Sequence, residues 1–261
     1  LGLGPDDRMQ VATPPFHILG LLNLLAAASA GAAVRLFPRF DLDSLLHHIE
    51  ADLVTIEMAV APIALAMADH PDLERYDLSS LRYIMWGATP VTESVARRVT
   101  ERTGVEFLPA YGASEVPVIT CNPVDRPEMW RLDSAGLPID DVELRVVDLE
   151  SGAEVEAGTT GEIQLRSPSM MAGYIPDEAN VEAFADGWYR TGDVGWVEPD
   201  GWLHLTDRVK EMIKVKGFQV APAEIEAVLH GHADVVDCAV FGVPDERAGE
   251  AVVAAVTLRD D

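Results

Sequence analysis

The stretch LRYIMWGATPVTESVARRVTERTGVEFLPAYGASE, residues 81–115, decides the fold class of this chain. Its first six residues, Leu81–Trp86, are mostly apolar and predict a strand that ends before Gly87. A helix is expected from about Thr92 to Arg102, and a second strand from Val105 to Leu108. Strands that alternate with helices in this way favour a parallel α/β sheet.

The residues before this stretch show the same alternation. Short strands are expected at Val34–Phe37, after a buried helix that ends near Gly31, and at Leu53–Met58. Pro62 is suited to the first turn of a helix. Asp41 is suited to cap a helix whose apolar residues follow the spacing i, i+3, i+4 and i+7, namely Leu42, Leu45, Leu46 and Ile49. Residues 1–115 are therefore predicted to form an α/β subdomain.

The pattern changes after Glu115. Alternating apolar and polar residues around Val142–Val146 and Gly161–Arg166, and a turn at Pro199-Asp200-Gly201, predict a barrel-like β-rich subdomain over residues 116–206. A helix at Pro222–Leu229 and strands at Val235–Val243 and Val252–Leu258 predict an α+β unit over residues 207–261. The expected fold is α/β: a partial large N-terminal domain, with a parallel sheet and a small barrel, and then a partial small C-terminal domain.

Composition argues against several classes of protein. The 261 residues are 48% hydrophobic, enough for a packed core, and the net charge of −25 repels nucleic acid and anionic membranes. The longest apolar run, Ile18–Val34, is short and interrupted, so no integral membrane segment is expected. Cys121 and Cys238 stand far apart, which argues against a disulfide framework. No signal-peptide pattern is visible, and we expect a cytoplasmic protein.

Lysine is confined to one short segment. Of the 19 basic residues only three are lysines, and Lys210, Lys214 and Lys216 lie close together in a chain that otherwise uses arginine. Lysine is a compact, mobile point charge that is suited to reach a phosphate or a carboxylate. The alternative is a solvated basic turn without a ligand.

Two further stretches carry side chains that are suited to bind a ligand or a metal ion. In Tyr111–Glu115, the tyrosine offers an aromatic face, Gly112 allows close backbone approach, Ser114 offers a hydroxyl to phosphate, and Glu115 is an oxygen ligand suited to Mg²⁺. In Trp188–Asp193, the carboxylate of Asp193 is suited to ribose hydroxyls. Each stretch alone is also compatible with an ordinary turn.

Six segments, in their order along the chain, resemble the adenylate-forming superfamily, which contains acyl- and aryl-CoA synthetases, luciferases and peptide-synthetase adenylation domains. The last segment, DRVKEMIKVKGFQVAPAEIE, is most similar to the 4-coumarate–CoA ligase branch. The segments are Pro15–Leu21, Trp86–Pro90, Tyr111–Glu115, Gly161–Ile163, Tyr189–Val194 and Asp207–Glu226.

This resemblance implies roles for individual residues. His17 and Ala88 would line the acid pocket, and Glu115 would hold Mg²⁺. Lys214 and Gln219 would contact the adenylate, and with Glu115 they form the expected catalytic set. The residues expected to bind nucleotide or CoA are Arg39, Gly87, Ala88, Tyr111, Gly112, Ser114, Asp193, Arg208, Lys210, Lys216 and Gly217. Among these, Lys210 matches a hinge, Lys216 and Gly217 would meet CoA, and Arg39 is the basic residue expected for CoA.

The resemblance also implies an activity. An AMP-forming ligase would join a fatty or aryl carboxylic acid to CoA with ATP and Mg²⁺, through an acyl-AMP. The family's phosphate loop would precede residue 1 and its catalytic lysine would follow residue 261, so we expect the chain alone to be impaired or inactive. The alternatives are an adenylation enzyme that loads a carrier protein, a luciferase-type monooxygenase, and a catalytically dead fragment that binds nucleotide.

Overall fold

The chain forms two compact units. The structure, a computed structural model, describes residues 2–86, 93–232, 234–245 and 247–259. The first unit comprises residues 1–142 with 167–172, and the second comprises residues 143–166 with 173–261. The division into segments 1–115, 116–206 and 207–261 stays a prediction.

A seven-stranded sheet forms the centre of the first unit, in the order β2-β1-β3-β4-β5-β6-β7. Strands β1 to β5 are parallel to one another, and β6 and β7 extend the sheet in antiparallel pairing. The strands are β1 (Arg8–Val11), β2 (Ala33–Leu36), β3 (Ile56–Ala59), β4 (Tyr83–Trp86), β5 (Phe107–Tyr111), β6 (Thr120–Cys121) and β7 (Leu137–Pro138). The expected parallel α/β sheet is confirmed.

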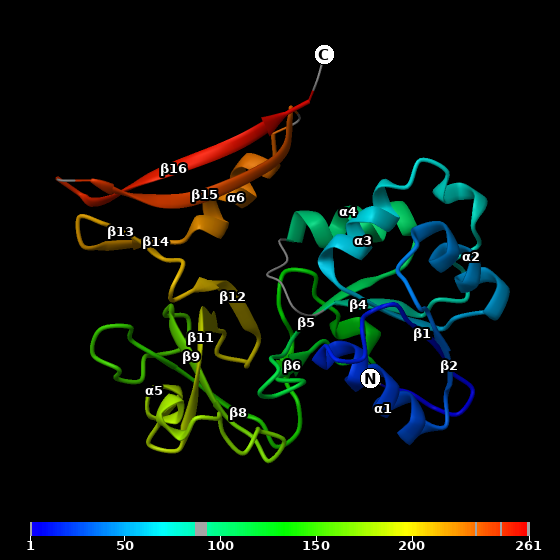
Figure 1. Ribbon diagram of the computed structural model, residues 1–261, viewed down its shortest axis with the longest axis horizontal. Helices are drawn as coiled ribbons and strands as arrows, with labels where there is room; N and C mark the ends of the chain where they lie inside the picture. Colours follow the sequence, from blue (N-terminus) through cyan, green and yellow to red (C-terminus); the bar gives the residue numbers. More distant parts are fainter. Residues whose placement is uncertain (1, 87–92, 233, 246, 260–261) are drawn as a thin grey trace. The chain divides into compact units, whose positions relative to one another are not determined.

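Helices cover both faces of this sheet (Figure 1). The helices of the first unit are α1 (Ile18–Ala30), α2 (Leu42–Asp52), α3 (Ala61–Asp69), α4 (Glu93–Thr103), η1 (Leu73–Arg75) and η2 (Pro127–Met129). Side chains of α2, α3 and α4 share one core with Ile84 and Phe107, whereas α1 shares the opposite core with Tyr83, Met85 and Leu108. Consecutive strand residues thus point into different cores, as the pleat of a strand dictates.

Local signals in the sequence set several helix ends. The side chain of Asp41 caps α2 by accepting a hydrogen bond from Ser44 N, and Pro62 lies in the first turn of α3, both as predicted. The helix before Gly31 is α1, and Gly31 ends it in the left-handed conformation. The expectation that this helix is buried was wrong in part, because Leu21 and Leu25 point outward from it.

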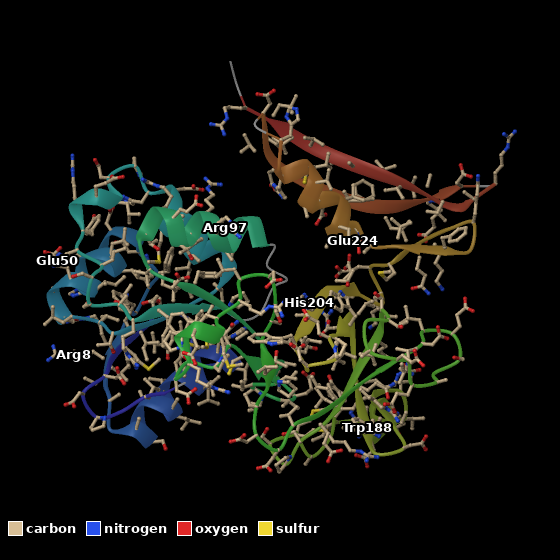
Figure 2. The ribbon with its side chains drawn as sticks, turned by 180° about the vertical axis from the view of Figure 1, so that it is seen from behind. Arg8, Glu50, Arg97, Trp188, His204 and Glu224 are labelled. Atoms are coloured by element: carbon tan, nitrogen blue, oxygen red, sulfur yellow. The ribbon has the colours of Figure 1, made fainter. Side chains whose placement is uncertain are left out.

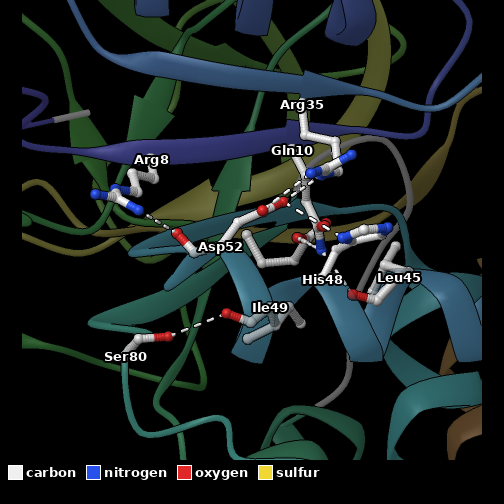
Figure 3. Close-up of polar contacts among 9 residues, drawn as sticks. Arg8, Gln10, Arg35, Leu45, His48, Ile49, Asp52 and Ser80 are labelled. Atoms are coloured by element: carbon white, nitrogen blue, oxygen red, sulfur yellow. Dashed lines mark hydrogen bonds and ion pairs between the residues drawn. The ribbon is translucent and has the colours of Figure 1, made fainter.

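Polar side chains fasten α2 to the sheet beneath it (Figure 3). Arg8 donates to Asp52 O at 2.8 Å, and Arg35 forms an ion pair with the Asp52 carboxylate. Deeper in the core, Gln10 Nε2 donates to Glu57 Oε2 at 2.8 Å and to Leu45 O at 3.3 Å. Glu57 is only 1% exposed, and this burial raises the pKa of its carboxyl to about 8.

The second unit contains two antiparallel sheets. The first has the order β10-β11-β9-β8, with β12 paired to the far end of β11, and among the described residues it is an open sheet. Its elements are β8 (Glu143–Val147), β9 (Gly161–Arg166), β10 (Phe184–Ala185), β11 (Trp188–Val197), β12 (Leu203–Arg208), α5 (Asn180–Ala183) and η3 (Asp177–Ala179). Figure 2 labels Trp188 at the start of β11 and His204 on β12. The hairpin predicted around Pro199-Asp200-Gly201 is the β11–β12 pair.

The second sheet of this unit has the order β14-β13-β16-β15. Its strands are β13 (Ile213–Val215), β14 (Phe218–Val220), β15 (Val235–Asp245) and β16 (Gly249–Leu258), and it is accompanied by helix α6 (Pro222–His230). Helix α6 packs on β15, and its Glu226 carboxylate accepts from Val240 N at 2.7 Å. Much of β16 stays exposed. Among the described residues, no helix combines the length and apolar composition that a membrane crossing requires.

Candidate active site

The carboxyl ends of the parallel strands gather the candidate residues of the first unit at one edge of its sheet. His17 follows β1, Arg39 follows β2, and Gly112–Glu115 follow β5. This edge is where open α/β sheets bind ligands. Since β2 and β5 are four positions apart in the sheet, the strand that precedes Arg39 lies about 19 Å from the strand that ends in Tyr111. Arg39 is therefore separated from the Tyr111 end of this edge.

The turn after β5 is shaped by close backbone packing. Tyr111 is the last residue of the strand, and Ala113 N donates to Val116 O at 2.9 Å. A Cβ at Gly112 would meet Pro117 O at 2.2 Å, so only glycine fits there. Glu115 is tied through its carbonyl, which accepts from Met171 N at 2.8 Å. Ser114 is left exposed at the tip of the turn.

His17 has a structural task in this conformation. It is the N-cap of α1, and its Nδ1 accepts from Leu19 N at 3.2 Å. The sequence pattern did not anticipate this role, because serine, threonine, aspartate and asparagine are the preferred caps. Gly87 and Ala88, expected to form a wall shared by the acid and the nucleotide, lie outside the described residues.

In the second unit, Asp193 and Arg208 face each other across strands β11 and β12. They are register partners, and Arg208 Nε donates to Asp193 Oδ1 at 3.1 Å. Arg208 is exposed, whereas the Asp193 side chain is 18% exposed. The carboxylate is thus held partly covered within β11, opposite the end of β12, and its negative charge is balanced by Arg208.

The hairpin β13–β14 carries four further candidates. Lys214 and Gln219 are register partners, so their exposed side chains project from the same face of the hairpin. Lys216 and Gly217 form its two-residue turn, with φ of 51° and 85°, as a type I′ turn requires. Lys210 lies in the turn between β12 and β13, where Glu211 N and Met212 N donate to Arg208 O. The three lysines therefore lie in the β12–β13 turn, in β13 and in the β13–β14 turn, directly after the last strand of the β8–β12 sheet.

The models of two protein families match two segments of the chain. The model of the AMP-binding enzyme family matches residues 1–175. The chain belongs to this family. The model of the AMP-binding enzyme C-terminal domain matches residues 224–261. The resemblance to the adenylate-forming superfamily is therefore confirmed.

Curated relatives of this chain include plant ligases. It is 40% identical over 268 residues to 4-coumarate–CoA ligase 2 of Oryza sativa subsp. japonica, covering 100% of this chain and 47% of that protein. It is 36% identical over 263 residues to 4-coumarate–CoA ligase 1 of Arabidopsis thaliana, covering 98% of this chain and 47% of that protein. The chain spans about half the length of the curated relatives it matches.

Solved structures show the same fold. The amide bond synthetase of Marinactinospora thermotolerans matches with a TM-score of 0.90 and 37% identity, over 99% of this chain and 53% of that chain. The o-succinylbenzoate CoA synthetase of Bacillus subtilis, solved with its acyl-adenylate intermediate, matches with a TM-score of 0.87 and 30% identity, over 100% of this chain and 53% of that chain. The predicted fold class of the chain is confirmed.

Among the described residues, Mg²⁺ would find at most a partial set of protein ligands. The described residues contain no group of three or more acidic, histidine or cysteine side chains able to cage a metal. Mg²⁺ characteristically takes one or two carboxylates, keeps several waters and completes its shell with phosphate oxygens. The single carboxylate of Glu115 suits that arrangement.

Several buried polar residues were not singled out by the sequence patterns. Glu162 and Thr191 are buried near Asp193 on strands β9 and β11. Gln10 and Glu57 form a hydrogen-bonded pair inside the parallel sheet. Asn23 is 0% exposed on α1, and neither of its amide atoms has a hydrogen-bond partner among the described residues. For Gln10, Glu57 and Asn23 the signal was a polar residue inside an otherwise apolar segment, whereas Glu162 and Thr191 stand in two of the segments that carry the family resemblance.

Proposed function

We propose that this protein is an AMP-forming acid–CoA ligase, active on a fatty or aryl carboxylic acid. The observation that carries the proposal is the Asp193–Arg208 pair, a 3.1 Å contact between the middle of β11 and the last residue of β12. Such a pair holds a carboxylate in a fixed orientation, where both of its oxygens are suited to the vicinal hydroxyls of a ribose. The similarity to plant CoA ligases over the whole chain supports the same reaction class.

Two transfer steps make up the proposed reaction. In the first, a carboxylate oxygen attacks the α-phosphorus of ATP, the bond to the pyrophosphate oxygen breaks, and acyl-AMP and pyrophosphate form. In the second, the CoA thiol loses its proton and attacks the acyl carbon, and AMP leaves with the bonding electrons. Positioning and charge neutralisation supply most of the catalysis in such transfers. Mg²⁺, held by Glu115 when bound, would neutralise phosphate charge.

We propose for the remaining residues the roles that the resemblance to the family implies. Lys214 and Gln219, on one face of the β13–β14 hairpin, would contact the adenylate together. Lys216 and Gly217, at the hairpin tip, would meet the phosphates of CoA. Lys210, in the turn that follows β12, would act as a hinge for the elements beyond it. Tyr111, Gly112 and Ser114 would border the adenine and the phosphates. His17 and Ala88 would line the acid pocket. Gly87 would form part of the adenine wall, and Arg39 would bind CoA.

The acceptor of the acyl group is the open point of this proposal. A carrier protein is the alternative acceptor, and an amine is a further candidate because one structural relative is an amide bond synthetase. A chain that only binds nucleotide would show no turnover with any acceptor. Since ATP and CoA are both supplied in the cytoplasm, we also propose a cytoplasmic location.

AMP release by the full natural polypeptide tests the proposal. The assay supplies ATP, Mg²⁺ and a pooled panel of fatty and aryl acids, with and without CoA. AMP release that needs both acid and CoA is the expected result. Pyrophosphate release that CoA does not accelerate would transfer the assignment to a carrier protein, amine or oxygen acceptor. The absence of both products would leave nucleotide binding as the function.

A further inference from the structure

Strand β11 is interrupted just where it presents Asp193. Its pairing with β9 is regular up to Arg190 and resumes at Val194 with a shifted register. Gly192, inside this interruption, has φ of 69°, and no atom lies within 4 Å of the place its Cβ would take. The Thr191-Gly192-Asp193 segment is therefore a bulge that departs from the sheet, and strand pairing to β9 alone does not fix the direction of Asp193.

The hydroxyl of Thr191 closes this bulge from inside. Thr191 is 8% exposed, and its Oγ1 donates to Ile163 O at 2.7 Å. The same oxygen accepts from Asp193 N at 3.0 Å. One buried atom thus links the neighbouring strand β9 to the backbone of Asp193. Since threonine is restricted at χ1, the position of this oxygen is fixed along with its methyl group.

An ion pair holds the bulge at its start. Arg190 Nε donates to Glu162 Oε2 at 3.0 Å, and the Glu162 side chain is only 5% exposed. Glu162 also accepts from Gln164 Nε2 at 3.4 Å. Strand β9 therefore contacts the bulge at two places, through the carboxylate of Glu162 and the carbonyl of Ile163.

We propose that Thr191 is a positioning residue that fixes Asp193 for contact with the ribose hydroxyls of the nucleotide. The inference rests on the proposed function, in which Asp193 binds that ribose. Arg208 holds the end of the Asp193 side chain at 3.1 Å, and Thr191 holds its backbone, so the carboxylate is fixed from both directions. Without the hydroxyl, Asp193 N and Ile163 O would each lose a partner and the bulge would relax.

The decisive measurement compares two nucleotides that differ only at the ribose. Calorimetry on the full natural polypeptide gives the affinities for AMP and for 2′,3′-dideoxy-AMP. The wild-type protein is expected to prefer AMP by about 10-fold or more, because hydrogen bonds to a charged group are each worth about 1.5–3 kcal/mol. In Thr191→Val, which keeps the shape but lacks the hydroxyl, this preference is expected to fall to about 2-fold or less.

Two variants control for general effects of the substitution. Thr191→Ser restores the hydroxyl and is expected to recover most of the preference for AMP. Thr257→Val makes the same chemical change at an exposed position of β16 and is expected to leave both affinities unchanged. If Thr191→Val does not fold, Glu162→Gln loosens the same bulge from its start and is expected to reduce the preference in the same direction.

The possible outcomes separate this inference from the function beneath it. A wild-type protein that prefers AMP, with Thr191→Val keeping that preference, would overturn the positioning role alone. An equal loss of affinity for both nucleotides in Thr191→Val would show a structural role and would also overturn it. A wild-type protein that binds neither nucleotide, or both equally, would overturn the ribose role of Asp193 itself.

Discussion

The parallel sheet of the first unit and the β13–β16 sheet of the second unit differ most in how well they are covered. Phe107 on β5 is 0% exposed between α-helices and sheet, whereas Phe218 on β14 is 76% exposed. Helices cover both faces of the parallel sheet, and α6 covers part of one side of β15. The same residue type therefore contributes to stability in one sheet and very little in the other.

The same difference in burial also separates residues that stabilise the fold from residues that are candidates for catalysis. Lys214, Lys216 and Gln219 are all exposed on the thinly covered sheet. Residues that are proposed to meet the adenylate and CoA have to remain accessible, and an exposed hairpin agrees with that proposal. We therefore expect substitutions in the parallel sheet to change folding, and substitutions on the β13–β14 hairpin to change catalysis.

The largest expected effect is the contrast between two phenylalanines. Phe107→Ala is expected to lower the free energy of unfolding by about 3–5 kcal/mol, because it removes a fully buried ring and leaves a cavity. Phe218→Ala is expected to change it by less than about 0.5 kcal/mol. Chemical denaturation of both variants measures the contrast. Equal destabilisation would show that the β13–β16 sheet is covered in solution.

The next effect concerns the carboxyl of Glu57. Its pKa is raised from 4.5 to about 8 by burial, so folding favours its protonated form. The resulting stabilisation is complete below pH 4.5 and is lost as the pH rises through about 8, at up to about 1.4 kcal/mol for each pH unit between. Denaturation curves from pH 5 to pH 8 measure this slope.

Two variants test whether Glu57 causes that slope. Glu57→Gln keeps the shape and the capacity to hydrogen-bond Gln10 but cannot ionise, and the fall in stability with pH is expected to become shallower. Asp237→Asn removes an exposed carboxylate from β15 and is expected to leave the slope unchanged. An unchanged slope in Glu57→Gln would place the titrating group elsewhere.

A third prediction concerns the exposed lysine of the hairpin. Lys214→Met is expected to reduce AMP formation by about 10²-fold, because one charge-stabilising group is lost at the adenylate. The free energy of unfolding is expected to stay within about 0.5 kcal/mol of wild type, since Lys214 is exposed. Arg259→Met, an equal change of charge just after β16, is the control and is expected to retain activity. Full activity in Lys214→Met would remove this residue from the catalytic set.

The smallest expected effect separates two asparagines. Asn23 is buried without a hydrogen-bond partner among the described residues, so Asn23→Leu is expected to raise the free energy of unfolding by about 1 kcal/mol. Asn180 accepts from Tyr174 N at 2.7 Å and donates to Tyr174 O at 3.1 Å, so Asn180→Leu is expected to lower it by about 1–2 kcal/mol. Thermal unfolding of both variants checks the opposite signs. A destabilising Asn23→Leu would contradict this prediction.

Local chemistry explains which parts of the fold were predictable. Asp41 caps α2 and Pro62 starts α3 because these residue types satisfy or tolerate the free N–H groups of a first helical turn. Strand β4 begins two residues later than expected, at Tyr83, because strand ends depend on pairing partners as well as on apolar character. His17 was expected in the acid pocket, and its capping of α1 depends on where the preceding loop brings its ring.

The sequence by itself determined the alternation of strands and helices, the helix caps and the family, because these depend on residue types at short spacing along the chain. Only the tertiary structure decided which residues meet across strands: Gln10 with Glu57, Asp193 with Arg208, Lys214 with Gln219. It also decided that Thr191 bonds both β9 and Asp193. The physical reason is that these pairings depend on strand register and burial, which distant parts of the chain set together.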